Sequence, residues 1–382
     1  MTGFGFGTLA LVAIIALVGP LLAVPPRLRI PVVVGELLAG IIFGRTGFGI
    51  IDADNPTFVL LANIGFALVM FVVGTHVPVR DATLRTALPK ALLRAVLVGA
   101  VAAVLGVVIA EVFDTGHAAL YAVLMASSSA ALALPVIDSL RLEGPAVLSL
   151  TAQIAIADAA SIVLVPLVIN PARAPRAALG ALAVAAGAVL LFLVLRHLDR
   201  RGVRRRVHKY SEKHRLAMEL RLSLIMLFTL SALAVATHVS IMLAGFALGL
   251  VMSAIGEPRR LARQLFGITE GFFGPLFFVW LGASLQVREL AERPAFLALG
   301  LALGFGAVVA HCAGRVAGQP LSLGALASAQ LGVPVAAATL GTEQALLAPG
   351  EPAALIVGAL VTIAVTSVAG LRAARTQSTA QP

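Results

Sequence analysis

The sequence predicts an all-α membrane protein with about 13 transmembrane helices, and three observations support this fold class. Of the 382 residues, 60% are hydrophobic and only 12% are charged, whereas soluble domains carry roughly 25% charged residues. The mean hydropathy is +1.02. The apolar residues also gather in stretches close to the length of about 20 residues that a membrane-spanning helix needs. There is too little charge here to cover a water-facing surface of this size.

These numbers exclude a soluble enzyme, a nucleic-acid-binding domain and a disordered chain. The single cysteine, Cys312, excludes an internal disulfide and a cysteine-based metal cluster. The sequence also has no nucleophile–base pair, no HExxH and no P-loop lysine. We therefore expect neither enzymatic activity nor a cofactor.

The predicted spans are connected by short segments, and the second span is short and rich in glycine. Only Thr237 and His238 separate the eighth span from the ninth. The spans run approximately over 4–24, 31–44, 56–76, 88–110, 117–138, 145–169, 174–196, 218–236, 238–255, 264–286, 294–314, 321–342 and 352–371.

Basic residues predict the orientation, because cytoplasmic loops of membrane proteins carry an excess of Lys and Arg. With 13 spans the two termini lie on opposite sides, and placing the C-terminus in the cytoplasm puts most basic residues there. The run RRGVRRRVHK at 200–209 is then a topology anchor beside anionic lipid, or alternatively a regulatory lipid or protein contact. The basic residues left outside are Arg45, Arg173, Arg176, Arg288 and Arg293.

An acid in the middle of a span is a functional candidate, because burying a charge at the bilayer centre costs about 3 kcal/mol or more. Asp158 lies mid-span in TAQIAIADAASIVLVPL, and no Lys or Arg occurs between Arg141 and Arg173. Asp158 is either a structural residue bonded to neighbouring backbone or a carboxylate that alternately holds a proton and an alkali cation. Glu36, in PVVVGELLAGIIFG, either lines a cavity or has a simple interfacial role.

Two spans carry helix-breaking residues in mid-membrane. One has three consecutive hydroxyls, Ser127, Ser128 and Ser129, followed by Pro135; the other, seven spans later, has Gln330, Gly332 and Pro334. Proline frees a backbone carbonyl, and interrupted spans at corresponding places in two halves indicate an inverted-repeat transporter with its site at the midplane. Asp158 lies on the span after the first interruption, and Gln153 lies five residues before it.

These residues resemble the cation:proton antiporter superfamily, in particular its second branch of bacterial sodium/proton and potassium/proton exchangers. The matches follow one another in the family's order over nearly the whole chain. They are PVVVGELLAGIIFGRTG, NIGFALVMFVVG, SSSAALALPVI, IADAASIVLVPL, GPLFFVWLGASL and IVGALVTIAVTSVAG.

The resemblance implies two crossed discontinuous helices and a homodimer in a bacterial inner membrane, with the N-terminus outside and the C-terminus cytoplasmic. It implies one antiporter unit over 1–376 and a short cytoplasmic tail at 377–382. Asp158 matches the exchanging carboxylate, which binds the transported cation, and Ser129 matches the hydroxyl residue that helps hold the ion, with Ser128 beside it. Ser127, Gln153, Gln330, Pro334 and Glu36 are supporting candidates. Within the unit, a dimerisation panel covers about 4–76 and 218–286, a moving core about 88–169 and 294–371, and a linker helix about 174–196.

The chain departs from the family pattern at several charged positions. Ala157 precedes the key Asp, and the family's usual lysine before the second interrupted helix is absent near Gly306 and Ala307. A single Asp carries one charge in either direction, so we predict electroneutral exchange of Na⁺ or K⁺ for H⁺. Two alternatives remain: a sodium-coupled organic-anion symporter, which would use the amides of Gln153 and Gln330, and a non-transporting sensor or partner subunit. Selectivity among Na⁺, K⁺ and Li⁺ depends on freed carbonyls, which leave no side-chain signature.

Overall fold

A computed structural model of the protein describes residues 4–23, 32–77, 82–214, 216–237, 239–256, 259–285 and 287–378. Every regular element in these residues is a helix, which confirms the all-α class. Ten helices are long and apolar enough to cross a membrane, and two shorter apolar helices accompany them. The count of 13 spans stays a prediction. The chain divides into two compact units, which are described one at a time.

The first unit comprises residues 1–80 and 175–285. Its helices are α1 (Phe6–Ala16), α2 (Val18–Ala23), α3 (Val32–Phe43), α4 (Pro56–His76), α9 (Ala174–Arg200), α10 (Val203–His214), α11 (Met218–Ala236), α12 (Ile241–Ile255), α13 (Arg259–Ile268) and α14 (Gly274–Ser284). A π-helical segment, Thr269–Phe273, joins α13 to α14. Pro275, two residues after its end, has no N–H to continue the regular ladder.

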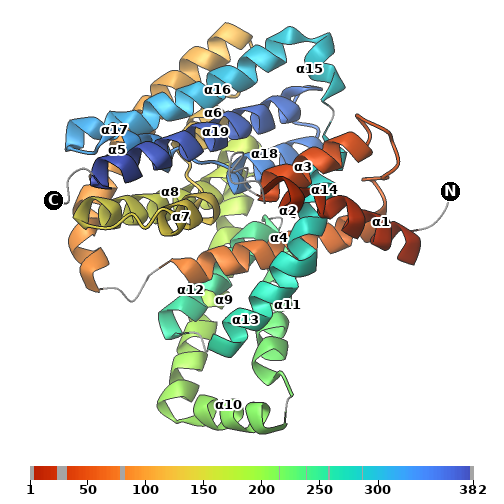
Figure 1. Ribbon diagram of the computed structural model, residues 1–382, viewed down its shortest axis with the longest axis vertical. Coiled ribbons are helices and arrows are strands. Elements are labelled where there is room, and N and C mark those ends of the chain that lie inside the picture. The colour runs from red at the N-terminus through yellow and green to blue at the C-terminus, as the bar shows by residue number, and fades with distance from the viewer. Residues whose placement is uncertain are drawn as a thin grey trace. The chain divides into compact units, whose positions relative to one another are not determined.

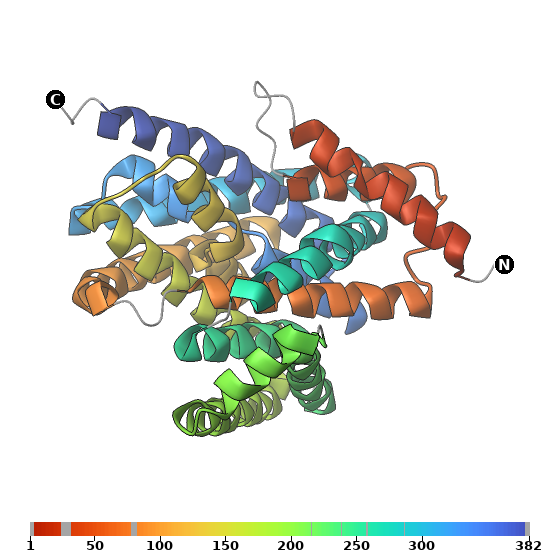
Figure 2. The same ribbon diagram turned by 60° about the horizontal axis from the view of Figure 1, so that its bottom comes forward.

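Helices α4 and α12 cross at glycines. A Cβ on Gly74 would lie 2.5 Å from the carbonyl oxygen of Phe246, and one on Gly249 would lie 2.6 Å from the Cα of Gly74. Only hydrogen fits at these positions, so the two backbones approach closely, as small residues allow in membrane helices. At one end of this unit α10 connects α9 to α11 (Figures 1 and 2). The sequence predicted a basic loop at this position.

The second unit comprises residues 81–174 and 286–382. Its elements are α5 (Ala82–Phe113), α6 (Ala118–Ala126), α7 (Ala130–Ser139), α8 (Pro145–Ile169), a 3-10 turn (Pro171–Arg173), α15 (Arg288–Glu292), α16 (Pro294–Cys312), a second 3-10 turn (Ala313–Ala317), α17 (Leu321–Ala327), α18 (Gly332–Glu343) and α19 (Glu351–Ser378). Residues 379–382 of the predicted tail lie outside the described residues.

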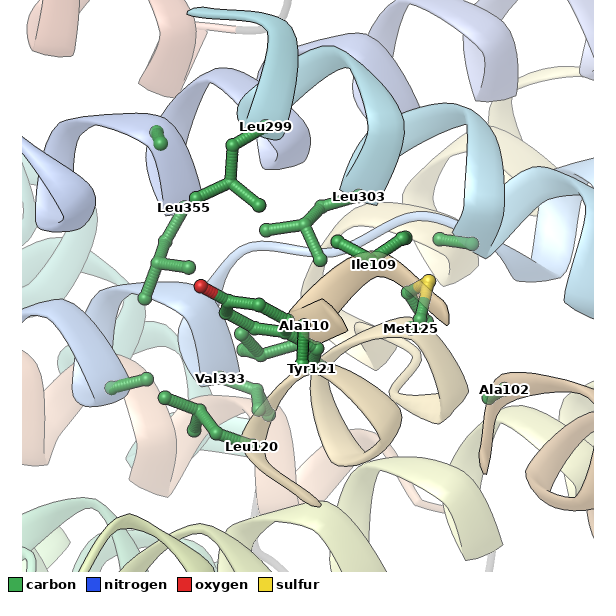
Figure 3. Close-up of a cluster of buried hydrophobic side chains, with 14 of the residues drawn as sticks. Ala102, Ile109, Ala110, Leu120, Tyr121, Met125, Leu299, Leu303, Val333 and Leu355 are labelled. Atoms are coloured by element: carbon green, nitrogen blue, oxygen red, sulfur yellow. The ribbon is translucent and has the colours of Figure 1, made fainter. Parts of the chain in front are cut away.

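A large apolar cluster holds the second unit together. Figure 3 shows Tyr121 and Met125 of α6 among Leu299 and Leu303 of α16, with Leu355 of α19 nearby. All five side chains are almost fully buried. Helices α16 and α19 run side by side (Figure 1), and Gly300 of α16 lies against the backbone of α19. This packing fixes α6, whose end forms part of the candidate site.

Candidate ion-binding site

Two helix pairs in the second unit are interrupted where the sequence predicts interruptions. Helix α6 ends at Ala126 and α7 begins at Ala130, with Ser127 and Ser129 in extended conformation between them. Helix α17 ends at Ala327 and α18 begins at Gly332. The interruptions precede Pro135 and Pro334, which lie inside α7 and α18.

The role expected for the prolines needs correction. Pro334 is the third residue of α18, and the first turn of a helix tolerates proline because its N–H groups have no helical partner. The breaks instead fall at hydroxyl and amide residues, whose side chains compete for backbone hydrogen bonds. Ser127 shows this directly, because its Oγ donates to the carbonyl of Leu124 at 2.7 Å.

The two interruptions contact each other through side chain-to-backbone hydrogen bonds. The Ser128 hydroxyl donates to the carbonyl of Ala327, at the end of α17. In the opposite direction, Gln330 Nε2 donates to the carbonyl of Leu124, near the end of α6, at 2.6 Å. Carbonyls in the last turn of a helix lack helical partners, and each broken helix supplies such a partner to the other.

Asp158 of α8 points to the start of α7. Its Oδ2 accepts a hydrogen bond from the backbone N–H of Ala130 at 3.0 Å, and its side chain is almost fully buried, at 5% exposure. The N-terminal end of a helix carries partial positive charge, which favours an anion there. Among the described residues no cationic side chain pairs with Asp158, and none donates to its second oxygen, Oδ1.

The remaining candidates divide into those near the interruptions and those elsewhere. Ser129 is the N-cap residue of α7 and is buried, but its side chain makes no capping hydrogen bond. Gln153 accepts a hydrogen bond from Gln319 Nε2 at 2.9 Å through its Oε1, so it belongs to a separate amide pair. Glu36 is buried in α3 of the first unit, whereas the other candidates belong to the second.

His311 is a member of the cluster that sequence reasoning did not select. This residue of α16 is fully buried, and its Nε2 lies 3.1 Å from the carbonyl oxygen of Ser127. A carbonyl only accepts, so Nε2 carries a proton and donates. His311 thereby supplies a donor to the break after α6. A histidine in the span where the family carries a lysine was the available signal.

Arg94 is the second such residue. It lies in α5 at 4% exposure and donates to Ser149 Oγ of α8 at 3.0 Å and to the carbonyl of Ala317 at 3.3 Å. No carboxylate pairs with it in the described part of the chain. Helix α8 is therefore held at Ser149 by a permanent cation and at Asp158 by the start of α7.

The arrangement offers oxygen donors of the kind that bind monovalent cations. A carboxylate, a nearby hydroxyl at Ser129 and backbone oxygens at two broken helices are the hard oxygen donors that alkali ions favour. The described residues contain no group of three or more His, Cys, Asp or Glu able to hold a metal ion. A resident transition metal would need such ligands, whereas a transported alkali ion needs one carboxylate and freed carbonyls.

Apolar spanning helices and a buried acid where two broken helices meet define a multi-pass membrane protein of the secondary-transporter class. The chain belongs to the sodium/hydrogen exchanger family, because the family model described as "Sodium/hydrogen exchanger, transmembrane" matches residues 13–372. The resemblance drawn from the sequence motifs is thus confirmed.

Two curated relatives have related sequences. The putative Na⁺/H⁺ antiporter YjbQ of Bacillus subtilis is 22% identical over 381 residues, covering 93% of this chain and 61% of the relative. The Na⁺/H⁺ antiporter NhaS5 of Synechocystis is 38% identical over 63 residues, covering 16% of this chain and 9% of the relative. The chain therefore spans less than two thirds of either relative.

Solved structures of the sodium proton antiporter MjNhaP1 from Methanocaldococcus jannaschii share the fold. The structure at pH 8 has a TM-score of 0.65 at 15% identity and covers 96% of this chain and 98% of its own. An electron-microscopy structure has a TM-score of 0.68 at 17% identity, with 98% and 97% covered. The antiporter-like fold class predicted from the sequence is confirmed.

Proposed function

We propose that the protein is a secondary antiporter that exchanges Na⁺ or K⁺ for H⁺ by alternating access. The observation that carries the proposal is the position of Asp158, a buried acid at the start of a half-helix with no cationic partner in the described part of the chain. Membership of the sodium/hydrogen exchanger family and the names of the two relatives support it.

In this mechanism a proton and a cation compete for the same carboxylate. The hydrogen bond from Ala130 engages Oδ2, which leaves Oδ1 to bind a proton or an alkali ion. After one ion leaves and before the other binds, the partial positive charge at the start of α7 stabilises the ionised acid. Ser129, with Ser128 and the freed carbonyls beside it, supplies further oxygens. Ser127, Gln153, Gln330 and Pro334 shape the surrounding backbone.

Exchange is electroneutral in this proposal, because Asp158 binds one monovalent ion or the other. The protein works as a homodimer in a bacterial inner membrane, with its N-terminus outside and its C-terminus in the cytoplasm. It uses no cofactor, and its partners are the bilayer, the cation and the proton. The panel, core and linker divisions predicted from the sequence belong to the same proposal.

The organic-anion symporter hypothesis receives less support from the geometry. Such a carrier would use free amides beside the crossing to bind substrate. Gln330 Nε2 is bonded to the carbonyl of Leu124. Gln153 Oε1 is bonded to Gln319, and its Nε2, which has no partner among the described residues, is fully buried. No observation favours a non-transporting sensor or partner subunit.

The test is proton flux in proteoliposomes that contain the full chain, screened across Na⁺, K⁺ and Li⁺ at several pH values. We expect cation-dependent flux in the wild type and none in Asp158→Asn. Asparagine keeps an oxygen that accepts from Ala130 but cannot ionise, so a purely structural Asp158 would leave flux intact. Asp138→Asn is the matched control, because Asp138 is exposed at the end of α7. Flux retained in Asp158→Asn would refute the assignment.

A further inference from the structure

An apolar cavity lies in the first unit, where α9, α10, α11, α12 and α13 come together. Its accessible volume is about 100 Å³, below the roughly 300–1,000 Å³ of typical ligand sites, so it has room for a slender group only. Nearly all of its lining is hydrocarbon. The side chains that form most of it are Leu195, Leu198, Val203, Val207, Leu222 and Met226.

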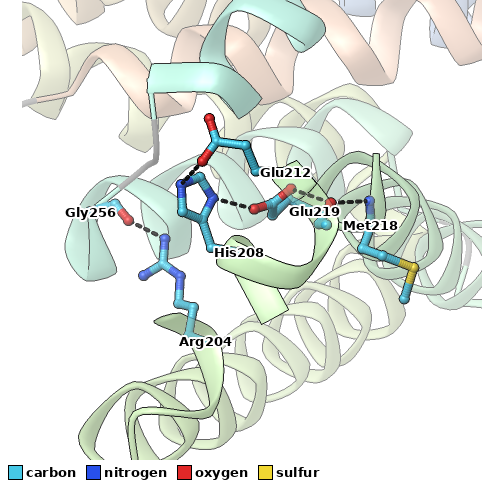
Figure 4. A network of polar contacts seen from close by, with 7 residues as sticks. Arg204, His208, Glu212, Met218, Glu219 and Gly256 are labelled. Atoms are coloured by element: carbon cyan, nitrogen blue, oxygen red, sulfur yellow. Dashed lines mark hydrogen bonds and ion pairs between the residues drawn. The ribbon is translucent and has the colours of Figure 1, made fainter. Parts of the chain in front are cut away.

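The few polar groups in the wall are already bonded to protein. Glu219 accepts hydrogen bonds from His208 Nδ1 at 2.5 Å and from Ser211 at 3.2 Å. Arg204 donates to the carbonyl of Gly256 and lies 4.0 Å from Asp199 Oδ1. Figure 4 shows these contacts fastening α10 to the start of α11 and to the end of α12. These contacts hold the helices around the cavity in place, and its interior favours an apolar ligand.

Two exposed arginines lie in the turn beside the cavity. Arg200 and Arg201 are exposed and lie in the turn between α9 and α10, and the residues flanking this turn, Leu198 and Val203, both line the cavity. Gly202, at a φ of 70°, allows the sharp turn that a side chain would disfavour. The one acid beside them, Asp199, is close to Arg204. Exposed guanidinium groups next to an apolar opening favour a ligand with an anionic head and an apolar tail.

The surroundings identify the source of such a ligand. Leu190 and Leu193 of α9 are 62% and 54% exposed, so this helix presents apolar side chains to its surroundings, as a lipid-facing helix does. On the predicted orientation this end faces the cytoplasmic leaflet, whose anionic lipids attract basic segments. We infer that the cavity binds one acyl chain of an anionic phospholipid, whose phosphate contacts Arg200 and Arg201.

The experiment is native mass spectrometry of the purified full chain in detergent, titrated with dioleoyl phosphatidylglycerol or dioleoyl phosphatidylcholine. We expect one tightly bound phosphatidylglycerol per chain and at least about tenfold weaker binding of phosphatidylcholine, because only the first carries a net negative head. Dihexanoyl phosphatidylglycerol and inorganic phosphate are the controls for the acyl chain, and neither is expected to displace the bound lipid. Equal binding of the two long-chain lipids, or displacement by phosphate alone, would overturn the inference.

Two variant pairs locate the bound lipid. Met226→Trp fills the cavity, and its matched control is Ile225→Trp, because Ile225 is the next residue on α11 and is 60% exposed. Arg200→Gln combined with Arg201→Gln removes the head contacts at exposed positions, and Arg176→Gln, at the other end of α9, is its control. We expect loss of the tight lipid in Met226→Trp and in the double variant only. The same loss in both members of a pair, or in neither, would contradict the proposal.

Discussion

The carboxylate of Asp158 and the backbone N–H of Ala130, 28 residues apart, form a buried hydrogen bond of 3.0 Å. This bond joins α8 to the first residue of α7, so the acid is attached to the interrupted helix itself. Any event that changes the charge of Asp158 acts directly on the point where the two broken helices meet. The predictions below follow from this connection and from its neighbours.

The bond predicts different stabilities for two substitutions of Asp158. Asp158→Asn keeps an acceptor for Ala130, so the midpoint of thermal unfolding in detergent should stay within a few degrees of the wild type. Asp158→Ala leaves the N–H of Ala130 unpaired, which costs about 1–3 kcal/mol, and its midpoint should fall clearly. Equal midpoints for the two variants would show that the hydrogen bond contributes nothing to stability.

His311 provides a second test through the carbonyl of Ser127. His311→Leu removes the only donor that the described residues direct to this carbonyl, and we expect a loss of about 1–2 kcal/mol together with slower exchange. His311→Gln retains an N–H donor and should recover part of both. Thermal unfolding and proteoliposome flux measure the two effects. Wild-type behaviour of the leucine variant would remove His311 from the site.

The charges of Arg94 and Asp158 lead to a prediction for the response of transport to membrane voltage. Arg94 stays charged throughout, because a guanidinium does not release its proton in proteins, so in the proposed mechanism the charge of the site changes only through what Asp158 binds. A site loaded with H⁺ and one loaded with Na⁺ then carry the same net charge. We expect the same exchange rate in proteoliposomes with and without a potassium diffusion potential set by valinomycin. A rate that follows the potential would contradict electroneutral exchange.

An ion pair joins the start of α6 to the start of α19. His117 Nδ1 lies 2.7 Å from Glu351 Oε1, which also accepts from the hydroxyl of Tyr121 at 2.7 Å. Glu351 Oε2 accepts from the backbone N–H of Ala348. The hydrogen bond to Glu351 raises the pKa of His117, which precedes α6, above its usual value of 6.5.

A histidine with a raised pKa in the folded state stabilises the fold at low pH. The stabilisation is fully present below the unfolded pKa of about 6.5 and is lost as pH rises through the higher folded value. We expect His117→Gln to unfold at a lower temperature than the wild type near pH 5. The difference between the two curves should shrink as the pH rises through the folded pKa of His117, because the histidine then loses its charge. A constant difference across this range would show that the charge of His117 has no effect on stability.

Several features of the site were accessible from the sequence because they interrupt an apolar pattern. Three hydroxyls in a row at Ser127, and Gln330 next to Gly332, marked the two breaks, and Asp158 was conspicuous as an unpaired acid in mid-span. The position of each break within its span was harder to predict, because the prediction relied on the prolines rather than on the hydroxyl residues. The position of the first break instead coincides with the hydrogen bonds that Ser127 and Ser128 donate.

Other features required three-dimensional contacts. His311 and Arg94 contact residues 184 and 55 positions away, and nothing in their local sequence announces these partners. Helix α10 was not predicted for a different reason. Helices were predicted from apolar stretches long enough to span a membrane, whereas α10 is short and strongly basic. Its apolar residues Val203 and Val207 are one turn apart and face a cavity, a pattern that becomes meaningful only with the neighbouring helices in place.

The glycine crossing of α4 and α12 has a practical consequence for anyone who wishes to engineer this protein. Replacing glycine by alanine is a common way to rigidify a helix, but at Gly74 the added methyl would collide with the carbonyl of Phe246. At Gly99 of α5 no atom lies within 4 Å of the added carbon. A thermostabilised version for structural work should therefore begin at Gly99 and leave the crossing untouched.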